Sequence, residues 1–322
     1  MIRNILARLL AVSAYFVVAS CGGSSGGNGG TNPPAPPSVT ADVRTVTIPG
    51  FPHEVDIYSV SNAARAVVFL HGGGGRNFKF AFDLGINAAD APPTLATANV
   101  AWLSANQVVA VFPQGQATAA APLAFTWNNH AMDSGEDDIG FLQALATFIR
   151  SEYRLSDVYL VGHSNGGMMV NRVWCESPDT FRAYVSLAGP ASSFYLGAPC
   201  VPATIQPYYG LVGEQDRVLQ VTGNWDQVTW EVDPLLATDF INPILIGEWQ
   251  QHQNRSQLMC GEVPALADAI TQDSIETWSN CGALLRVQRA LNAGHMIDSL
   301  EQQFADRLVD VIADFIGFVE TL

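Results

Sequence analysis

The feature that most restricts the fold of this chain is a short apolar run that leads directly into a glycine-rich turn. Residues 158–161 read Val-Tyr-Leu-Val, and the turn that follows reads Gly162-His-Ser-Asn-Gly166. A segment with helical spacing, residues 165–175, leaves the turn. A buried strand, a sharp turn and a helix can project a serine hydroxyl from the end of a sheet as a nucleophile. Ser164 is therefore the predicted nucleophile, and the alternative is a glycine-rich turn with an inert Ser.

Other segments have the pattern of an α/β sheet. The apolar runs at residues 66–70, 108–112 and 184–187 are continuous, as in parallel strands that are buried on both faces. Helical spacing is present at residues 138–153 and in the closing segment 301–319. Strands that alternate with helices in this order imply a mostly parallel sheet with right-handed connections.

The remaining segments complete the predicted domain. Residues 43–48 and 54–60 alternate apolar and polar side chains, which predicts an antiparallel hairpin at a sheet edge. Residues 83–106 predict a loop and a helix, and residues 219–261, which hold three Trp, predict a lid or cap near the site. We expect one α/β domain over residues 41–322, with a mostly parallel central sheet flanked by helices.

A serine nucleophile also needs a site that stabilises an oxyanion. Residues 71–75 read His-Gly-Gly-Gly-Gly at the end of a predicted strand, which matches loops whose backbone N–H groups point into such a site. No Lys-Ser/Thr follows, which excludes a phosphate-binding P-loop. We assign the two donors to the amides of Asn165 and Gly73, with Gly74 as the near rival. His71 is expected to stabilise the loop by hydrogen bonding.

The general base is expected downstream, because in this type of site the acid and then the His follow the Ser. Two of the six His lie well after Ser164. His295 follows the strand-like residues 284–291, and a loop His in that place can reach the nucleophile. His252 lies in a polar, helical-looking stretch, and we expect it at the surface. His295 is therefore the predicted base.

The predicted acid is Asp216. It lies beyond the strand-like residues 208–213, at the edge where this type of sheet places the acid. Glu214 is the rival two residues earlier, and Asp226 and Asp233 are weaker candidates because no strand leads into them. Asp216 would hold the imidazole of the base in one tautomer and stabilise its charged form.

Several residues beside these motifs have two interpretations. Trp127 fits either a pocket wall or the packed core. Asp137 and Asp138 open a predicted helix, where carboxylates stabilise the helix dipole. Met168 and Met169 follow the nucleophile turn, and we expect both to pack in the core.

The first residues predict export. Residues 1–20 combine two Arg, a short apolar run and small residues before Cys21, as in a cleaved signal peptide. The Val-Ala-Ser-Cys sequence that ends at Cys21 resembles the lipobox of bacterial lipoproteins, in which that Cys is lipidated. An ordinary signal peptide is the alternative. Gly22 in place of Asp favours, by the same resemblance, the outer membrane of a Gram-negative envelope. Residues 21–40 are rich in Gly, Ser and Pro and predict a linker.

Charge and cysteine content narrow the function further. The net charge of −15 and the absence of a basic run exclude nucleic acid as a partner. Four more cysteines in an exported chain predict two disulfides, with three connectivities. Short-range closure favours Cys175–Cys200 and Cys260–Cys281, and free buried thiols are the alternative. No Cys or His spacing indicates a metal site, and no cofactor is expected.

Taken together, these motifs resemble the α/β-hydrolase superfamily. More narrowly, they are similar to the polyhydroxybutyrate depolymerase / feruloyl esterase family of secreted esterases, including its LpqC-like lipoproteins. The segments that carry the resemblance are His71-Gly-Gly-Gly-Gly75, Phe112-Pro-Gln-Gly115, Thr126-Trp127, Asp137-Asp-Ile-Gly-Phe141, Gly162-His-Ser-Asn-Gly-Gly-Met-Met169, Pro178-Asp-Thr-Phe181, Ala188-Gly-Pro190 and Gly294-His295. The resemblance implies an α/β-hydrolase fold, a triad of Ser164, Asp216 and His295, and a disulfide between Cys260 and Cys281.

The chain departs from that family at two places. It continues after His295 with Met296-Ile-Asp298, where the family usually has Trp-Pro-Gly, and Gly213-Glu-Gln-Asp216 replaces the usual Gly-Thr-x-Asp. Both changes leave the triad intact and concern the substrate. No further domain follows the last predicted helix, so we do not expect a crystalline polymer as substrate.

The sequence therefore predicts a secreted, lipid-anchored serine esterase. Its substrate would be a small or oligomeric carboxylic ester, and its other partner the membrane that holds the lipid at Cys21. The alternatives are a peptidase or other acyl hydrolase on the same fold, and a surface lipoprotein without catalytic activity.

Overall fold

The computed structural model describes residues 39–322 apart from 118–123, 217, 219–229 and 232–243. The predicted signal peptide, Cys21 and all but the last two residues of the linker lie outside this part of the chain, as do Asp226 and Asp233. Within it, Val39–Leu322 is one compact unit. No helix of the described residues is long and apolar enough to cross a membrane.

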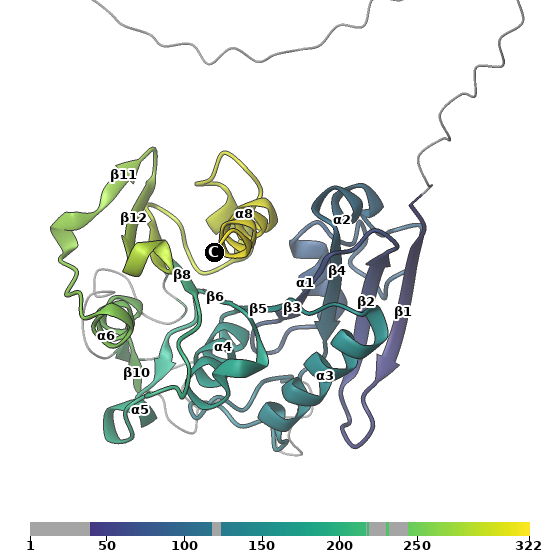
Figure 1. Cartoon of the computed structure of the whole chain (residues 1–322), viewed down its shortest axis with the longest axis horizontal. Helices are drawn as coiled ribbons and strands as arrows, with labels where there is room; N and C mark the ends of the chain where they lie inside the picture. Colours follow the sequence, from purple (N-terminus) through teal and green to yellow (C-terminus); the bar gives the residue numbers. More distant parts are fainter. Residues whose placement is uncertain (1–38, 118–123, 217, 219–229, 232–243) are drawn as a thin grey trace, which may run out of the picture. The chain divides into compact units, whose positions relative to one another are not determined.

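The core of the unit is a ten-stranded sheet, drawn in Figure 1. In spatial order its strands are β1 Ala41–Thr47, β2 Glu54–Val60, β4 Val108–Pro113, β3 Arg65–Leu70, β5 Val158–His163, β6 Tyr184–Leu187, β8 Tyr208–Gly213, β13 Leu285–Ala290, β12 Ile275–Asn280 and β11 Ile270–Gln272. The strands from β4 to β13 are parallel, and both edges are antiparallel. The predicted parallel sheet and the predicted hairpin of β1 and β2 are confirmed.

Helices cover both faces of this sheet. The helices are α1 Asn77–Asp83, α2 Val100–Asn106, α3 Asp138–Tyr153, α4 Asn165–Glu176, α5 Phe194–Gly197, α6 Glu248–Cys260, α7 Ile297–Glu301 and α8 Leu308–Glu320, with short 3-10 turns η1 Pro178–Thr180, η3 Leu266–Asp268 and η4 Cys281–Ala283. Val67 and Phe69 of β3 pack with α1, α2, α7 and α8, whereas Ala66 and Val68 pack with α3 and α4. Because successive side chains of a strand point to opposite faces, burial of both faces explains the continuous apolar runs.

The end of the chain differs from the single helix expected over residues 301–319. Two helices, α7 and α8, replace it, and residues 302–307 between them are not helical. The Glu301 carboxylate accepts a hydrogen bond from the backbone N–H of Leu308 (3.0 Å), at the first turn of α8. The Leu308 N–H is one of the first amides of α8, which have no hydrogen-bond acceptor within the helix. Its bond to Glu301 therefore favours the start of a new helix at Leu308.

Helix α6 and two of the three strands of a smaller sheet come from residues 219–261, where the sequence predicted a lid. The smaller sheet has the order β7 Ala191–Ser192, β10 Ile244–Ile246, β9 Trp230–Glu231. Most of the segment that precedes α6 lies outside the described residues. The lid hypothesis therefore stays a prediction.

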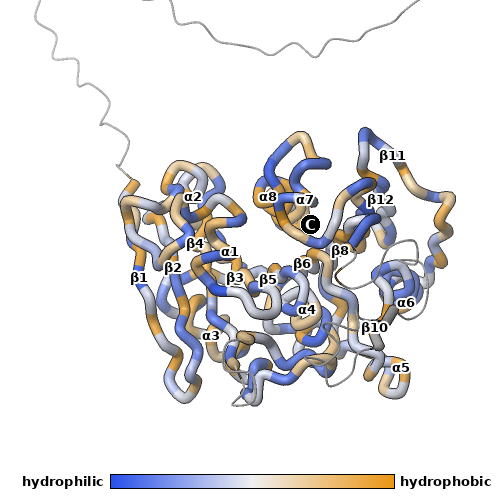
Figure 2. Tube along the Cα trace, turned by 180° about the vertical axis from the view of Figure 1, so that it is seen from behind, coloured by the Kyte–Doolittle hydropathy of each residue, from blue (hydrophilic) through white to orange (hydrophobic). Residues whose placement is uncertain are grey.

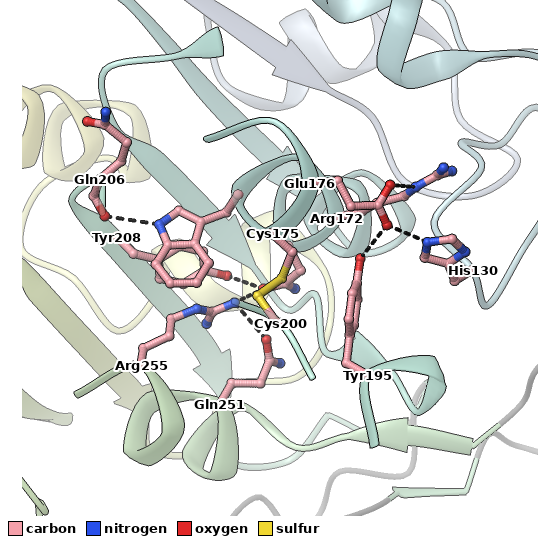
Figure 3. Close-up of a disulfide and its surroundings, with 12 residues drawn as sticks. His130, Arg172, Cys175, Glu176, Tyr195, Cys200, Gln206, Tyr208, Gln251 and Arg255 are labelled. Atoms are coloured by element: carbon pink, nitrogen blue, oxygen red, sulfur yellow. Dashed lines mark hydrogen bonds and ion pairs between the residues drawn. A yellow bond between two sulfur atoms is a disulfide. The ribbon is translucent and has the colours of Figure 1, made fainter. Parts of the chain in front are cut away.

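Helix α6 corrects the expectation for His252. Figure 2 shows α6 as largely hydrophilic, whereas α8 is largely hydrophobic. The polar sequence of α6 predicts a position at the surface for His252. The expectation is wrong, because His252 is 1% exposed and its Nε2 lies 2.8 Å from Asn280 Oδ1. Arg255 is also buried, with its guanidinium 3.6 Å from the ring centre of Tyr208 and a hydrogen bond to Gln251 (Figure 3). Asn280 and Tyr208 from the sheet, and Gln251 from α6 itself, thus replace apolar contacts.

Both disulfides have the short-range pairing that the sequence favoured. Cys175, near the end of α4, is joined to Cys200 (Figure 3), and Cys260, at the end of α6, is joined to Cys281. Cys260, Glu262 and Cys281 bring three potential metal-ligand atoms close together. Both sulfurs are consumed by the disulfide, so this group does not have the thiolates that a metal would need.

Candidate active site

The turn at Ser164 has the strained geometry of a nucleophile at the end of a strand. Its backbone angles are φ 54° and ψ −118°, a conformation that costs a residue with a side chain about 1–3 kcal/mol. A side chain at Gly162 would overlap the Gly166 carbonyl, and one at Gly166 would overlap the Leu70 carbonyl. The Ser164 N–H donates to the Leu187 carbonyl (2.8 Å). The glycines are therefore required by the close approach of neighbouring backbones.

Three side chains that are far apart in the sequence meet at this turn. His295 Nε2 lies 2.8 Å from Ser164 Oγ, and His295 Nδ1 lies 2.7 Å from Asp216 Oδ2. Asp216 follows β8, and His295 lies between β13 and α7. Asp216 is fully buried and His295 is 6% exposed, so water screens neither interaction strongly. The arrangement can transfer the Ser164 proton to the imidazole while the carboxylate holds the ring.

The carboxylate and the imidazole are each held by further contacts. Asp216 Oδ1 accepts from the Val218 N–H (3.0 Å). His163 Nε2 lies 2.8 Å from the His295 carbonyl and donates to it, and burial lowers the pKa of His163 to about 3. The rival acid Glu214 instead accepts from the Asn292 N–H (3.2 Å). The structure therefore places Asp216, and not Glu214, against His295.

The backbone hydrogen bonds separate the candidate oxyanion donors. The Gly74 N–H donates to the Phe125 carbonyl (2.7 Å), so this rival is already engaged. The Gly73 N–H donates to no described residue. Asn165 is the first residue of α4, and its N–H has no acceptor within the helix. An added Cβ at Gly73 would lie 3.6 Å from Asn165 Cβ, so the two residues are neighbours.

His71 fixes the shape of the glycine-rich loop. Its Nδ1 lies 2.7 Å from the Gly72 carbonyl and donates to it, and its Nε2 accepts from the Gly115 N–H (2.9 Å). Burial lowers the pKa of His71 to about 4, so the ring is neutral near pH 7 and can accept that bond. Trp127 Nε1–H donates to the His71 carbonyl (3.0 Å). Trp127 is fully buried and serves the packed core rather than a pocket wall.

The sequence did not predict several residues that hold the Ser164 turn and its surroundings through hydrogen bonds. The Asn165 side chain accepts from the Trp127 N–H (2.7 Å), and Asn129 Nδ2–H donates to the Asn165 carbonyl (3.1 Å). Asp138 is fully buried between His53 and Ser134, so it does more than complement a helix dipole. No local pattern reveals these roles, because Trp127, Asn129 and His53 come from segments distant from the residues that they contact.

A cavity of about 400 Å³ opens beside Ser164. Its walls include the glycine-rich loop, His295 and the apolar side chains of Phe80, Met132, Met168 and Met296. Met168 and Met169 both pack in the hydrophobic core as expected, and Met168 also lines the cavity. Two cations, Arg76 and Lys79, also line it and were not predicted. Their place directly after the glycine-rich loop could have indicated this.

Comparison with solved structures decides the fold. The structure superposes on the acetyl xylan esterase from Aspergillus awamori with a TM-score of 0.55 and 14% identity, covering 87% of this chain and 99% of that one. This is the α/β-hydrolase fold. Esterase PE8 gives 17% identity and a TM-score of 0.44, covering 80% of this chain and 93% of that one. No family model and no curated protein matches the sequence. The similarity therefore establishes the α/β-hydrolase fold alone.

The α/β-hydrolase fold explains why these segments converge. In a parallel sheet the carboxyl ends of the strands lie at one edge, and here β5, β8 and β13 end there with Ser164, Asp216 and His295 close behind. The chain order Ser, Asp, His is that of the α/β hydrolases.

Proposed function

We propose that this protein is a serine esterase that hydrolyses carboxylic esters through an acyl-enzyme. The observation that carries the proposal is the continuous chain of hydrogen bonds from Ser164 Oγ through His295 to Asp216, at the wall of a cavity. A serine hydroxyl is a weak nucleophile unless a base accepts its proton. His295 Nε2 lies 2.8 Å from Ser164 Oγ, a distance at which such a transfer occurs, and Asp216, 2.7 Å from His295 Nδ1, orients the ring.

The first half of the reaction forms the acyl-enzyme. Ser164 Oγ attacks the ester carbonyl carbon while His295 Nε2 takes its proton, and Asp216 stabilises the imidazolium. The amides of Gly73 and Asn165 donate to the negative oxygen of the tetrahedral intermediate. The intermediate collapses, the C–O bond to the alcohol breaks, and His295 returns the proton to the leaving oxygen.

The second half releases the acid. Water donates a proton to His295 Nε2 as its oxygen attacks the acyl carbon, and the same two amides stabilise the second oxyanion. The bond to Ser164 Oγ then breaks, and His295 returns the proton to that oxygen. The enzyme is regenerated without any cofactor in the cycle.

The replacement of Ser164 tests the proposal directly. We expect Ser164→Ala to lower kcat/KM for 4-nitrophenyl acetate and butyrate by about 10³-fold or more, because the covalent step is lost. The matched control is Ser193→Ala, which changes a serine at the start of α5 outside the cavity. Circular dichroism would check that both variants fold. Unchanged ester hydrolysis by folded Ser164→Ala would overturn the proposal.

The substrate family and the anchor are finer proposals. The motifs shared with polyhydroxybutyrate depolymerases and feruloyl esterases favour small or oligomeric esters of hydroxy or aromatic acids. The lipobox-like sequence at Cys21 favours an exported lipoprotein of the cell envelope, in the outer membrane if the source is Gram-negative. Two disulfides suit an oxidising compartment outside the cytoplasm.

The anchor has its own test. We expect Cys21→Ser to move the protein from the membrane pellet to the soluble fraction, because acyl chains on Cys21 would anchor it in the bilayer. Fractionation and immunoblotting of cells that express either form would measure this. The parallel change Cys175→Ser, which affects only a disulfide, should leave the protein in the pellet. Membrane retention of Cys21→Ser would contradict a lipid at this position.

A further inference from the structure

Two of the few basic side chains of this acidic chain lie beside the candidate active site. The formal net charge is −15, with only 15 Lys and Arg, and Lys79 is the only lysine. Lys79 and Arg76 both line the cavity beside Ser164. Two cations at this cavity would attract an anionic ligand, which the net negative charge of the chain would otherwise repel.

The two cations are not equivalent. Lys79 forms an ion pair with Asp83 one turn later, and Asp83 lines the same cavity, so this charge is neutralised. Arg76 forms no ion pair or side-chain hydrogen bond with any residue that the structure describes. Its guanidinium lies 3.8 Å from the centre of the Phe125 ring. This contact leaves the in-plane N–H groups of Arg76 without a described acceptor.

Arg76 is held in place by the same residues that shape the oxyanion loop. The carbonyl of Phe125 accepts from the Gly74 N–H (2.7 Å), while the ring of Phe125 stacks on Arg76. On the other side, Gln114 accepts from the Asn77 N–H (3.1 Å) and donates to the Gly75 carbonyl (3.3 Å). The guanidinium is therefore positioned before a ligand arrives.

Two acids lie near Arg76 without forming an ion pair with it. Arg76 also borders a second hollow, which Glu54 and Asp56 line. The Asp56 carboxylate is already bonded to Thr45 Oγ1 (2.6 Å) and Asn77 Nδ2 (2.8 Å). Neither Asp56 nor Glu54 forms an ion pair with Arg76 in the described part of the chain.

We infer that Arg76 binds a carboxylate carried by the substrate, so that the preferred esters are anionic. This rests on the esterase function proposed above. A guanidinium recognises a carboxylate through two parallel N–H···O bonds, and few other groups match that geometry. The apolar walls formed by Met132, Met168 and Phe80 would hold the carbon chain between the ester and the carboxylate.

Two pairs of esters test the inference and locate the carboxylate. 4-Acetoxybenzoate and 4-acetoxybenzamide differ only in charge on the alcohol arm. The mono-4-nitrophenyl ester of adipic acid and its adipamide counterpart differ in the same way on the acyl arm. The quantity measured is the ratio of kcat/KM for the anionic ester to that for its neutral partner. Because hydrolysis of the neutral partner reports folding and catalysis, the ratio isolates recognition of the carboxylate.

We expect Arg76→Gln to lower this ratio by about tenfold to hundredfold for one of the two pairs, mainly through KM, because a charge-assisted contact is lost. Arg76→Lys should recover part of the loss. Arg182→Gln is the matched control, since Arg182 is an exposed arginine before β6 that lies outside the cavity, and it should leave the ratio within about twofold.

The outcomes separate the two proposals. If the neutral esters are hydrolysed and Arg76→Gln leaves both ratios unchanged, the carboxylate inference fails while the esterase function stands. If Arg182→Gln lowers the ratio as much as Arg76→Gln, the effect is one of net charge and the inference also fails. If the wild-type protein hydrolyses none of the four esters, the esterase function fails, and the inference with it.

Discussion

At the scale of single residues, two buried histidines, His71 and His163, lie near the pair Ser164 and His295 that exchanges a proton. Burial keeps both of these histidines neutral. The pKa of His71 is lowered to about 4 and that of His163 to about 3. Each donates a ring N–H to a backbone carbonyl, of Gly72 and of His295 respectively. A second positive charge beside His295 would oppose the imidazolium that forms during the reaction. Neutral rings can therefore position the loops without disfavouring proton transfer.

The same titrations predict sensitivity to acid. Burial also lowers the pKa of His252 to about 4, so three histidines take up protons on unfolding as the pH falls below their ordinary value of 6.5. Glu248 has the opposite effect between pH 4.5 and about 7, because burial raises its pKa to about 7. The histidines outweigh it, and we expect the free energy of unfolding to fall by on the order of 1–3 kcal/mol per pH unit between pH 6.5 and 4.5.

Urea unfolding at several pH values measures this dependence. The variant His252→Gln removes one of the three titrating rings and should make the slope shallower. A free energy of unfolding that stays constant or rises on acidification over this interval would show that the buried histidines do not control acid stability.

At the scale of elements, the predicted strands and helices agree with the structure where the hydropathy pattern within a single segment indicates the element. Strands β3, β4, β5 and β6 are buried on both faces, so their apolar runs are unbroken and the sequence indicates them directly. Helix α6 gave the opposite result. Its polar face is buried because Asn280 and Tyr208 supply partners for His252 and Arg255, and both of these partners lie in strands outside the helix.

Some boundaries of elements depended on individual contacts that the hydropathy pattern does not show. The break between α7 and α8 accompanies a hydrogen bond from the Leu308 N–H to Glu301. Strand β11 is exposed along its length, so it lacks the apolar alternation that would have indicated it. Such features follow from tertiary contacts rather than from local propensity.

At the scale of the whole domain, the sequence identified the candidate triad because each member follows a recognisable strand. The sequence assigned Gly73 over Gly74 from the motif alone, whereas the observation that separates them is a hydrogen bond from Gly74 to Phe125, about fifty residues away. The position of Arg76 after the glycine-rich loop is visible in the sequence, but its contact with the ring of that same Phe125 is not. A parallel sheet gathers these distant segments at one edge, which is what makes a composite site available.

The central claim is that His295 activates Ser164 as a nucleophile. The most direct measurement is the rate of labelling by a fluorophosphonate probe, with the modified residue mapped by mass spectrometry, in the wild-type protein and in His295→Asn. We expect a single adduct at Ser164, formed at least about 10³-fold more slowly in the variant. An adduct at another residue, or equally fast labelling of Ser164 without His295, would contradict the claim.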